Sequence, residues 1–190
     1  MAVKMRLCTV ISALATLILT VLYLVCKHSV LLSLAITAGT FLYHFAMRLA
    51  VGAVVNALMH NRADATRFWF RPHAFEKKLY ARLGIRKWRE RMPTYDPSLF
   101  SLQKHSVKEI LGASCQAEVV HEVIMLLSFL PLLTVPFFGA FWVFFATSLL
   151  AAAYDSLFVL MQRYARPHLL RAAQRTEQKK ETDHDPCRSV

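Results

Sequence analysis

The most constraining feature of this chain is an apolar segment without a charged residue at positions 7–26, LCTVISALATLILTVLYLVC. As a helix, its 20 residues match the roughly 30 Å thickness of the hydrocarbon core of a bilayer. Lys4 and Arg6 precede it, as basic residues also precede the core of a secretory signal peptide. That core is shorter, roughly 7–15 residues, and Val25 before Cys26 fits neither an A-x-A nor a lipoprotein-type cleavage site. We therefore expect a retained membrane anchor, with a cleaved signal peptide as the alternative.

The composition supports a membrane environment for most of the chain. Of the 190 residues, 56% are hydrophobic and 18% are charged, against about 45–50% and about 25% in soluble domains. Such hydrophobicity excludes disorder over most of the length. The four cysteines form neither a CxxC pair nor a zinc-ligand spacing, so neither a disulfide framework nor a metal site is expected.

Three further apolar segments, at residues 29–59, 119–135 and 137–160, predict four membrane-spanning helices in total. None of them alternates with period two, so strands are not expected. The third segment is barely long enough and has Glu122 near its start, so a re-entrant or tilted segment is the alternative there. The predicted fold is thus an all-α polytopic membrane protein with a single integral membrane domain over residues 1–170.

The positions of the basic residues predict the topology. The net charge is +11, and ten Lys and Arg residues lie within residues 62–91, with seven more after residue 160. The link between the first two spans holds only Lys27, and the link between the last two holds neither Lys nor Arg. The positive-inside rule therefore places both termini and the loop at residues 60–118 on the cytoplasmic side of the cell membrane. No zinc-finger, bZIP or RNP pattern is present, which favours anionic lipids over nucleic acid as the partner.

The central loop and the C-terminal tail have different characters. Residues 75–83 predict a short basic amphipathic helix that ends at Gly84 and lies in the headgroup plane. Trp69 and Trp88 suit the same depth. An interfacial anchor without chemistry is an equal interpretation of this loop. The polar residues 171–190 predict a disordered tail.

One pair of residues suggests acid–base chemistry. Glu118 and His121 are three positions apart on a predicted helix, which places them on one face. A carboxylate beside an imidazole holds its tautomer and raises its basicity, as a general base acting on a hydroxyl requires. Glu-x-x-His is also half of a di-iron site, but the second such motif is absent from the sequence.

Polar residues within the spans form a second candidate group. His44 and Arg48 share one side of the second span, where they face protein or water, and we include them among the substrate-binding candidates. Hydrogen bonding to neighbouring helices is the structural alternative. Asp155 in the last span is a candidate partner for Arg48 across the bundle, because pairing is the least costly arrangement of such charges in hydrocarbon.

Familiar catalytic motifs are missing from the chain. The segments HNRAD and HSVKE are each one residue short of the His-x4-Asp/Glu pattern of soluble glycerolipid acyltransferases. No GxSxG elbow, P-loop or GxGxxG is present either. The residues alone thus predict a small membrane protein with a His/Glu site and leave enzyme and non-enzyme equally open.

Three stretches together resemble the glycosyl-4,4'-diaponeurosporenoate acyltransferase family: FEKKLYARLGIRKWRERMP, SCQAEVVHEVIMLLSFLP and QRYARPHLLR. The resemblance covers residues 62–171. It implies an enzyme that esterifies a fatty acyl chain onto the sugar of a glycosylated carotenoid acid. It also implies catalytic roles for Glu118 and His121. The substrate-binding residues that it implies are Lys87, Trp88, Gln162, Arg163, Tyr164 and Arg166.

These observations lead to one functional hypothesis and its alternatives. A fatty acyl thioester is the co-substrate, no other cofactor is expected, and His121, oriented by Glu118, deprotonates a hydroxyl of an amphiphilic glycosylated acceptor. Holding both lipids in one leaflet supplies the proximity that direct transfer needs. Cys115 as an acyl-carrying nucleophile is an alternative mechanism. The alternative function is a non-enzymatic membrane anchor that binds a partner or anionic lipids through its basic loop.

Overall fold

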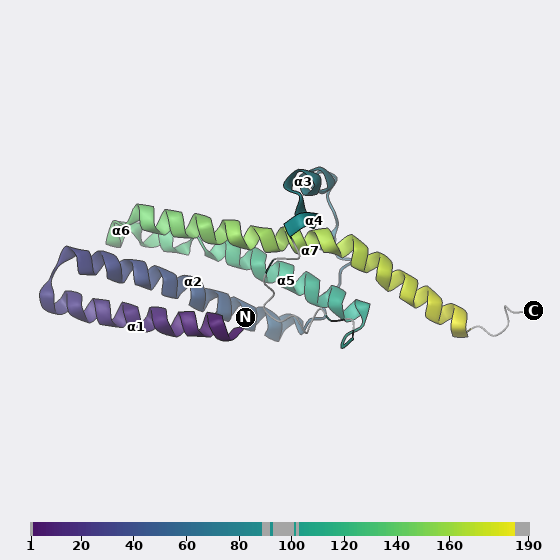
Figure 1. The fold of residues 1–190 in the computed structure, drawn as a ribbon, viewed down its shortest axis with the longest axis horizontal. Coiled ribbons are helices and arrows are strands. Elements are labelled where there is room, and N and C mark those ends of the chain that lie inside the picture. The colour runs from purple at the N-terminus through teal and green to yellow at the C-terminus, as the bar shows by residue number, and fades with distance from the viewer. Residues whose placement is uncertain (1, 89–91, 93–100, 102, 185–190) are drawn as a thin grey trace, which may run out of the picture.

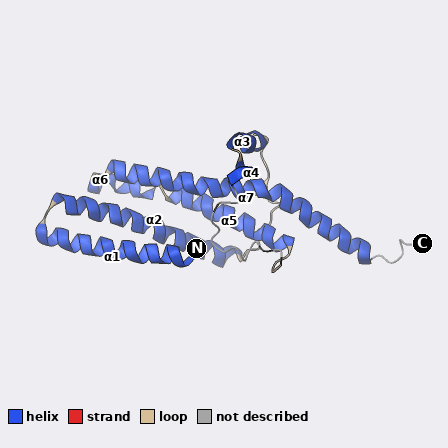
Figure 2. Cartoon of the chain, viewed as in Figure 1, coloured by secondary structure: helices blue, strands red, loops and turns tan. Residues whose placement is uncertain are grey.

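The computed structural model describes residues 2–88, 92, 101 and 103–184, and this part of the chain contains helices and loops but no strand (Figure 2). Four segments are long and apolar enough to cross a membrane: Val3–Cys26, Ser29–Met59, Val107–Phe138 and Phe141–Gln178. The predicted all-α fold with four candidate membrane spans is therefore confirmed.

The long helices form two hairpins that pack side by side (Figure 1). Helix α1 (Ala2–Cys26) pairs with α2 (Ser29–Met59), α5 (Val107–Leu127) pairs with α7 (Phe141–His184), and α2 contacts both α5 and α7. Both hairpin turns lie at one end of the bundle, and the connection from α2 to α5 lies toward the other, which we call the loop end. The first turn of α1 and the C-terminal half of α7 also lie toward the loop end.

The sequence predicted that the third span begins at residue 119. In the structure its helix, α5, already begins at Val107. Ser106 caps it with a capping box, in which the Ser106 hydroxyl accepts from the Glu109 amide and the Glu109 carboxylate accepts from the Ser106 amide, at 3.3 and 2.9 Å. Residues 107–118 include Lys108, Glu109 and Glu118, so the continuous apolar run begins only after them, but many of these residues are buried against protein. Hydropathy alone therefore placed the start of this helix too late.

The end of the third span is irregular. Helix α5 stops at Leu127, and the chain continues as a 3-10 turn (η4, Leu130–Thr134) and a short helix (α6, Val135–Phe138). Pro131 and Pro136 each remove a backbone donor, which explains why the α-helical ladder does not continue. Gly139, at φ 63°, ends α6 in the left-handed region and allows the tight turn into α7.

Helix α7 extends well beyond the predicted span and corrects two predictions. It starts at Phe141 and continues to His184, whereas the sequence predicted a span ending at residue 160 and a disordered tail from residue 171. Ala, Gln, Arg, Lys and Glu predominate after residue 171, and all five are strong helix formers that extend an existing helix readily. Residues 185–190 of the predicted tail lie outside the described part of the chain.

The connection between α2 and α5 carries a 3-10 turn (η1, Phe68–Phe70) and the short helices α3 (Glu76–Leu83) and α4 (Ile85–Trp88). Helix α3 matches the predicted amphipathic helix and ends at Gly84, which adopts the left-handed conformation at φ 60°. It projects sideways from the bundle near the loop end (Figure 1). An amphipathic helix in that position suits the headgroup plane.

Two apolar clusters hold these elements together. Met47, Val51 and Val55 of α2 pack against Ile124 of α5. Nearer the loop end, Ala65 and Phe70 of the connection pack against Leu111 and Cys115 of α5. The connection is therefore packed firmly onto the α5 surface.

Gly112 permits a close approach of the connection to α5. A Cβ atom at this position would lie 2.5 Å from the backbone oxygen of Asn61, so only glycine fits. The approach brings the chain that follows α2 into contact with the first half of α5. It thereby sets the position of the polar residues that follow.

Candidate functional site

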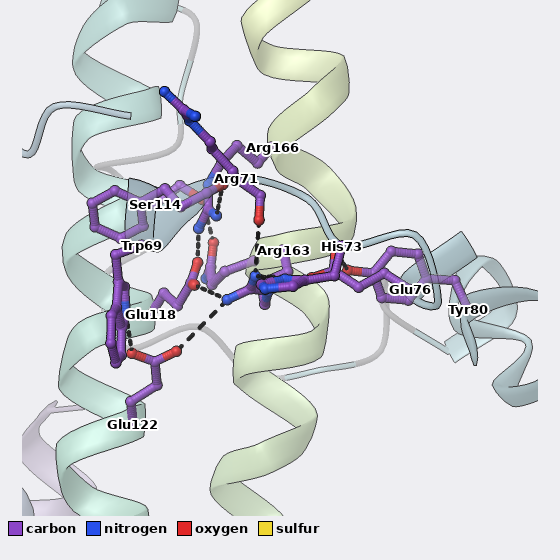
Figure 3. A network of polar contacts seen from close by, with 12 residues as sticks. Trp69, Arg71, His73, Glu76, Tyr80, Ser114, Glu118, Glu122, Arg163 and Arg166 are labelled. Atoms are coloured by element: carbon purple, nitrogen blue, oxygen red, sulfur yellow. Dashed lines mark hydrogen bonds and ion pairs between the residues drawn. The ribbon is translucent and has the colours of Figure 1, made fainter. Parts of the chain in front are cut away.

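Two groups of polar side chains lie along the seam between α5 and α7. The first, near the loop end, we call the interface network; it comprises Trp69, His73, Glu76, Tyr80, Glu118, Glu122, Arg163 and Arg166 (Figure 3). The second lies toward the hairpin turns and comprises Arg48, His121 and Asp155, which we call the Asp155 cluster.

Arg163 is the centre of the interface network. Its Nη1 donates to Glu118 Oε1 at 2.9 Å and its Nε donates to Glu76 Oε1 at 2.9 Å. Glu122 Oε1 lies 3.9 Å from Nη1, and the backbone oxygen of Arg71 accepts from Nη2 at 3.2 Å. One guanidinium thus joins α7 to α5, to α3 and to the connecting loop (Figure 3).

Glu118 lies between two arginines and is fully buried. Besides Arg163, it forms an ion pair with Arg166, whose Nη1 also donates to the backbone oxygen of Phe70 at 2.8 Å. The Arg166 guanidinium lies 4.8 Å from the centre of the Phe70 ring, within the range of a cation–π contact. Removing one partner from such a buried set leaves an uncompensated charge, which costs far more than the set contributes.

Glu76 brings α3 to the network. Its carboxylate is buried and accepts from the Tyr80 hydroxyl at 2.7 Å, with His73 Nδ1 at 3.1 Å. Burial by itself would raise the pKa of Glu76, but the bonds to Tyr80 and His73 and the Arg163 charge together hold it below its usual value. Burial and the bond to Glu76 raise the pKa of Tyr80. Glu76 is therefore an anion at neutral pH that anchors α3 to α7.

The remaining contacts fasten the loop to the seam. The Trp69 indole donates to Glu122 Oε2 at 2.7 Å. A cavity of about 230 Å³ lies between α3 and α7, and its walls include Leu79, Leu160 and Arg163. It combines apolar walls with a charged end, as expected for part of a site that accepts an amphiphile.

The Asp155 cluster draws one residue from each of three helices. Asp155 of α7 is 1% exposed, and its Oδ1 lies 2.8 Å from Nδ1 of His121 on α5. Its Oδ2 forms an ion pair with Arg48 of α2, which confirms the partner that the sequence suggested for Arg48. Both carboxylate oxygens are therefore engaged.

The contact with Asp155 favours one tautomer of a neutral His121. A carboxylate accepts hydrogen bonds, so the proton of a neutral imidazole lies on Nδ1 and Nε2 carries the free lone pair. The ring stacks on Phe158, with 4.5 Å between ring centres, and its side chain is 22% exposed. His121 thus has the orientation and the access that a general base needs.

The predicted pairing of Glu118 with His121 is corrected by the structure. The two residues are close in the sequence, but Glu118 pairs with Arg163 and Arg166, and His121 pairs with Asp155. Charge-assisted bonds to guanidinium groups are stronger than a bond to a neutral imidazole. When α7 packs against α5, Arg163 and Arg166 therefore form ion pairs with the carboxylate of Glu118.

The other predicted site residues differ in their positions: Gln162, Tyr164 and His44 lie in or beside the helix bundle, whereas Lys87 and Trp88 lie on α4. Ser114 donates to Gln162 at 2.7 Å in the buried seam, and Tyr164 packs edge-on against Tyr80 with 5.4 Å between ring centres. His44 is buried one turn from Arg48, and neither of its ring nitrogens has a hydrogen-bond partner among the described residues.

Lys87 and Trp88 instead lie on α4, where the Trp88 indole donates to the Leu83 backbone at 3.0 Å. The contacts of the described residues do not bring these two into either group.

Several members of the site are not predicted from the sequence, and Asp155 and Glu76 are the most important of them. Asp155 was considered only as a partner for Arg48, although an acid inside an apolar helix is itself a signal of function. Glu76 adjoins Lys77 and Lys78, so it resembles a solvated residue, and no local signal distinguishes it. Among the described residues, no group of three His, Cys, Asp or Glu side chains is arranged to hold a metal ion.

Comparison with known proteins identifies the family. The family model described as glycosyl-4,4'-diaponeurosporenoate acyltransferase matches residues 66–175, more than half of the chain. The match includes α3, α5 and most of α7, and it leaves out α1 and α2. No curated protein and no solved structure gives a significant match. The matched region contains the interface network and two of the three residues of the Asp155 cluster. Because the match covers more than half of the chain, the chain belongs to the glycosyl-4,4'-diaponeurosporenoate acyltransferase family.

Proposed function

We propose that this protein transfers a fatty acyl group from a thioester to a hydroxyl of a glycosylated, carotenoid-like acceptor, with His121 as the general base. The observation that carries the proposal is the 2.8 Å contact between His121 Nδ1 and Asp155 Oδ1 in the seam of an apolar bundle. An acyltransferase that acts on a lipid acceptor needs a base that can reach the hydroxyl of this acceptor. His121 has both properties, since its second nitrogen is a proton acceptor and its ring is partly exposed.

The proposed reaction has two steps, and its protons balance. As the acceptor oxygen attacks the thioester carbonyl, its proton passes to Nε2 of His121, which leaves a tetrahedral intermediate. The carbon–sulfur bond then breaks, and the thiolate takes the proton from Nε2 as it leaves. A positioned base of this kind contributes about 10²–10⁴-fold to the rate, and Asp155 stabilises the imidazolium that forms between the two steps.

In this scheme Glu118 is a structural residue rather than the residue that orients the base. Arg163 and Arg166 are already engaged by Glu118 and by loop carbonyls, so we assign them to holding the loop over the seam. The exposed basic residues of α3 and α4 are better placed to meet the phosphates of a donor or of anionic lipids; they are Lys77, Lys78, Arg82, Arg86 and Lys87.

The proposed orientation places the loop end in the cytoplasm. The basic residues of the connection and of α7 support this orientation through the positive-inside rule. Acyl thioesters are water-soluble through their carrier and lipid-soluble through their chain. A site near the inner surface of the membrane therefore allows such a donor to enter from the cytoplasm.

The proposal is tested with membranes that contain the wild-type protein, His121→Ala or the control His105→Ala. His105 lies before α5 and pairs with Glu109 at 3.4 Å, away from the seam. We expect labelled acyl-CoA and a glycosylated carotenoid extract to yield a labelled ester with the wild type and the control. A loss of at least about 100-fold is expected for His121→Ala at equal protein amount.

Two results would contradict the proposal in different ways. Near wild-type ester formation by His121→Ala would remove His121 from the mechanism. The lack of any ester with the wild type, for acceptors of several classes, would favour the non-enzymatic anchor. In that case the basic surface of α3 would be the functional element.

A further inference from the structure

We propose that Arg48 is a positioning residue of the acyl-transfer centre, so that the α1–α2 hairpin completes a site whose other residues lie on α5 and α7. This inference rests on the function proposed above. It concerns a part of the chain, residues 2–59, that the family match does not include. Under this inference the hairpin is more than a membrane anchor.

The contacts of Arg48 support this role. Its Nη2 pairs with Asp155 Oδ2, while its Nη1 donates to the backbone oxygen of His44 at 3.2 Å, which fixes the guanidinium plane from its own helix. Its side chain is 15% exposed, so water screens the pair little. The position of α2 is also fixed, because Met47 and Val51 on either side of Arg48 pack into the cluster that contains Ile124 of α5.

The charge of Arg48 determines which protons the Asp155 cluster holds. A carboxylate inside a membrane bundle is costly without a counter-charge. With Arg48 on Oδ2, the Asp155 carboxylate has a counter-charge that does not require a second proton on His121, so a neutral imidazole can pair with it and accept a proton at Nε2. Without Arg48, the only contact described for the Asp155 carboxylate is His121, and this favours an ion pair of Asp155 with a doubly protonated His121. An imidazolium cannot act as a base.

The other charged and titratable groups around the cluster are few. His44 faces it from α2, and Tyr154 neighbours Asp155 on α7. On α5, Glu118 lies one turn before His121, and Glu122 directly follows it. Both of these carboxylates pair with groups of the interface network. Helix α1 packs on α2, and its charged residues, Lys4 and Arg6, lie near its first turn. Arg48 is therefore the principal counter-charge of Asp155.

The test uses chemical labelling of His121, which needs no substrate. Diethyl pyrocarbonate modifies imidazole only in its unprotonated form, and mass spectrometry of the His121 peptide from membranes labelled between about pH 5 and about pH 9 gives the pH midpoint for His121. We compare the wild type with Arg48→Gln, Arg48→Lys and the control Arg62→Gln, an arginine just beyond α2. Repeating the series with His44→Asn removes the titration of the neighbouring imidazole.

We expect Arg48→Gln to move the His121 midpoint upward by at least about one pH unit. Arg48→Lys and Arg62→Gln should keep the wild-type midpoint. Ester formation by Arg48→Gln should fall at least about tenfold at pH 7 and recover as the pH rises, because a higher pH restores the neutral base.

The outcomes separate this inference from the proposed function. An unchanged midpoint in Arg48→Gln, or a loss of activity that is equal at every pH, would overturn the positioning role and leave a packing role. A shifted midpoint in Arg48→Gln, together with a wild-type protein that forms no ester, would support the Arg48–Asp155–His121 coupling and refute the acyl transfer. If Arg48→Gln does not accumulate in membranes, a midpoint in Arg48→Lys that differs from the wild type by more than about one pH unit overturns the inference, and an equal midpoint supports it.

Discussion

Nδ1 of His121 lies 2.8 Å from Oδ1 of Asp155, although the two residues are 34 positions apart and belong to different helices. The contact joins α5 to α7 inside an apolar bundle, where an unpaired acid would be costly. In a neutral imidazole this contact favours the tautomer with the proton on Nδ1, which leaves Nε2 as a proton acceptor. This relationship is the strongest reason to place chemistry in the seam.

Replacing Asp155 with Asn should reduce ester formation by at least about 100-fold, because an amide neither fixes the productive tautomer nor stabilises the imidazolium. The measurement is acyl transfer in membranes at equal protein amount. Ser156→Ala is the matched control, since its hydroxyl donates to the Ala153 backbone oxygen in its own helix. Activity of Asp155→Asn within about threefold of the wild type would remove Asp155 from the mechanism.

Replacing Glu118 with Gln should chiefly destabilise the protein, because Arg163 and Arg166 lose the carboxylate that they share. Breaking a buried charge set of this kind costs about 3–5 kcal/mol, which a thermal melt in detergent detects as a large fall in Tm. Glu177→Gln is the control: its pair with Lys108 spans 3.8 Å on the surface and is worth about 0.5 kcal/mol or less. If Glu118→Gln keeps its stability but loses activity, the pairing of Glu118 with His121 predicted from the sequence regains support.

Two helical glycines should respond in opposite ways to alanine. At Gly112 the new Cβ would lie 2.5 Å from the Asn61 oxygen, so overpacking should cost about 1–3 kcal/mol and loosen the connection from α5. At Gly52 a new Cβ would have no such neighbour within 4 Å, and the better helix former should stabilise by about 0.5–1 kcal/mol. Thermal melts of both variants measure the difference. A Gly112→Ala protein as stable as Gly52→Ala would contradict the close approach of the loop.

The network around Glu76 should make stability depend on pH in the acid range. Because the pKa of Glu76 is lower in the folded protein than its ordinary value of 4.5, its contribution is complete above that pH and is lost as the pH falls through the folded pKa. The free energy of unfolding of Glu76→Gln should therefore be about 2 kcal/mol lower than that of the wild type at pH 7. The difference should narrow steadily below about pH 4.5. Melts at several pH values measure it, and a difference that is constant with pH would show that the carboxylate charge contributes nothing.

Features that depend on local composition and spacing can be predicted from the amino-acid sequence. Apolar runs of membrane length predicted four helices, and Gly84 correctly predicted the end of α3, because hydropathy and left-handed backbone conformation are properties of short segments. The three stretches that carry the family resemblance also lie in the sequence itself, and the family match over residues 66–175 confirms that resemblance. Segments that depend on burial against protein were less predictable, as the early start of α5 at Val107 shows.

The pairing of the polar groups depends on how the helices pack. Spacing predicted that Glu118 and His121 share a helix face, but neighbours on one helix compete with every group that a second helix brings near. When α7 packs against α5, Arg163 and Arg166 take the carboxylate of Glu118, and Asp155 takes the imidazole of His121. In a medium that solvates charge poorly, the set of pairs that leaves the least charge uncompensated prevails, and that set depends on helix packing rather than on distance along the chain.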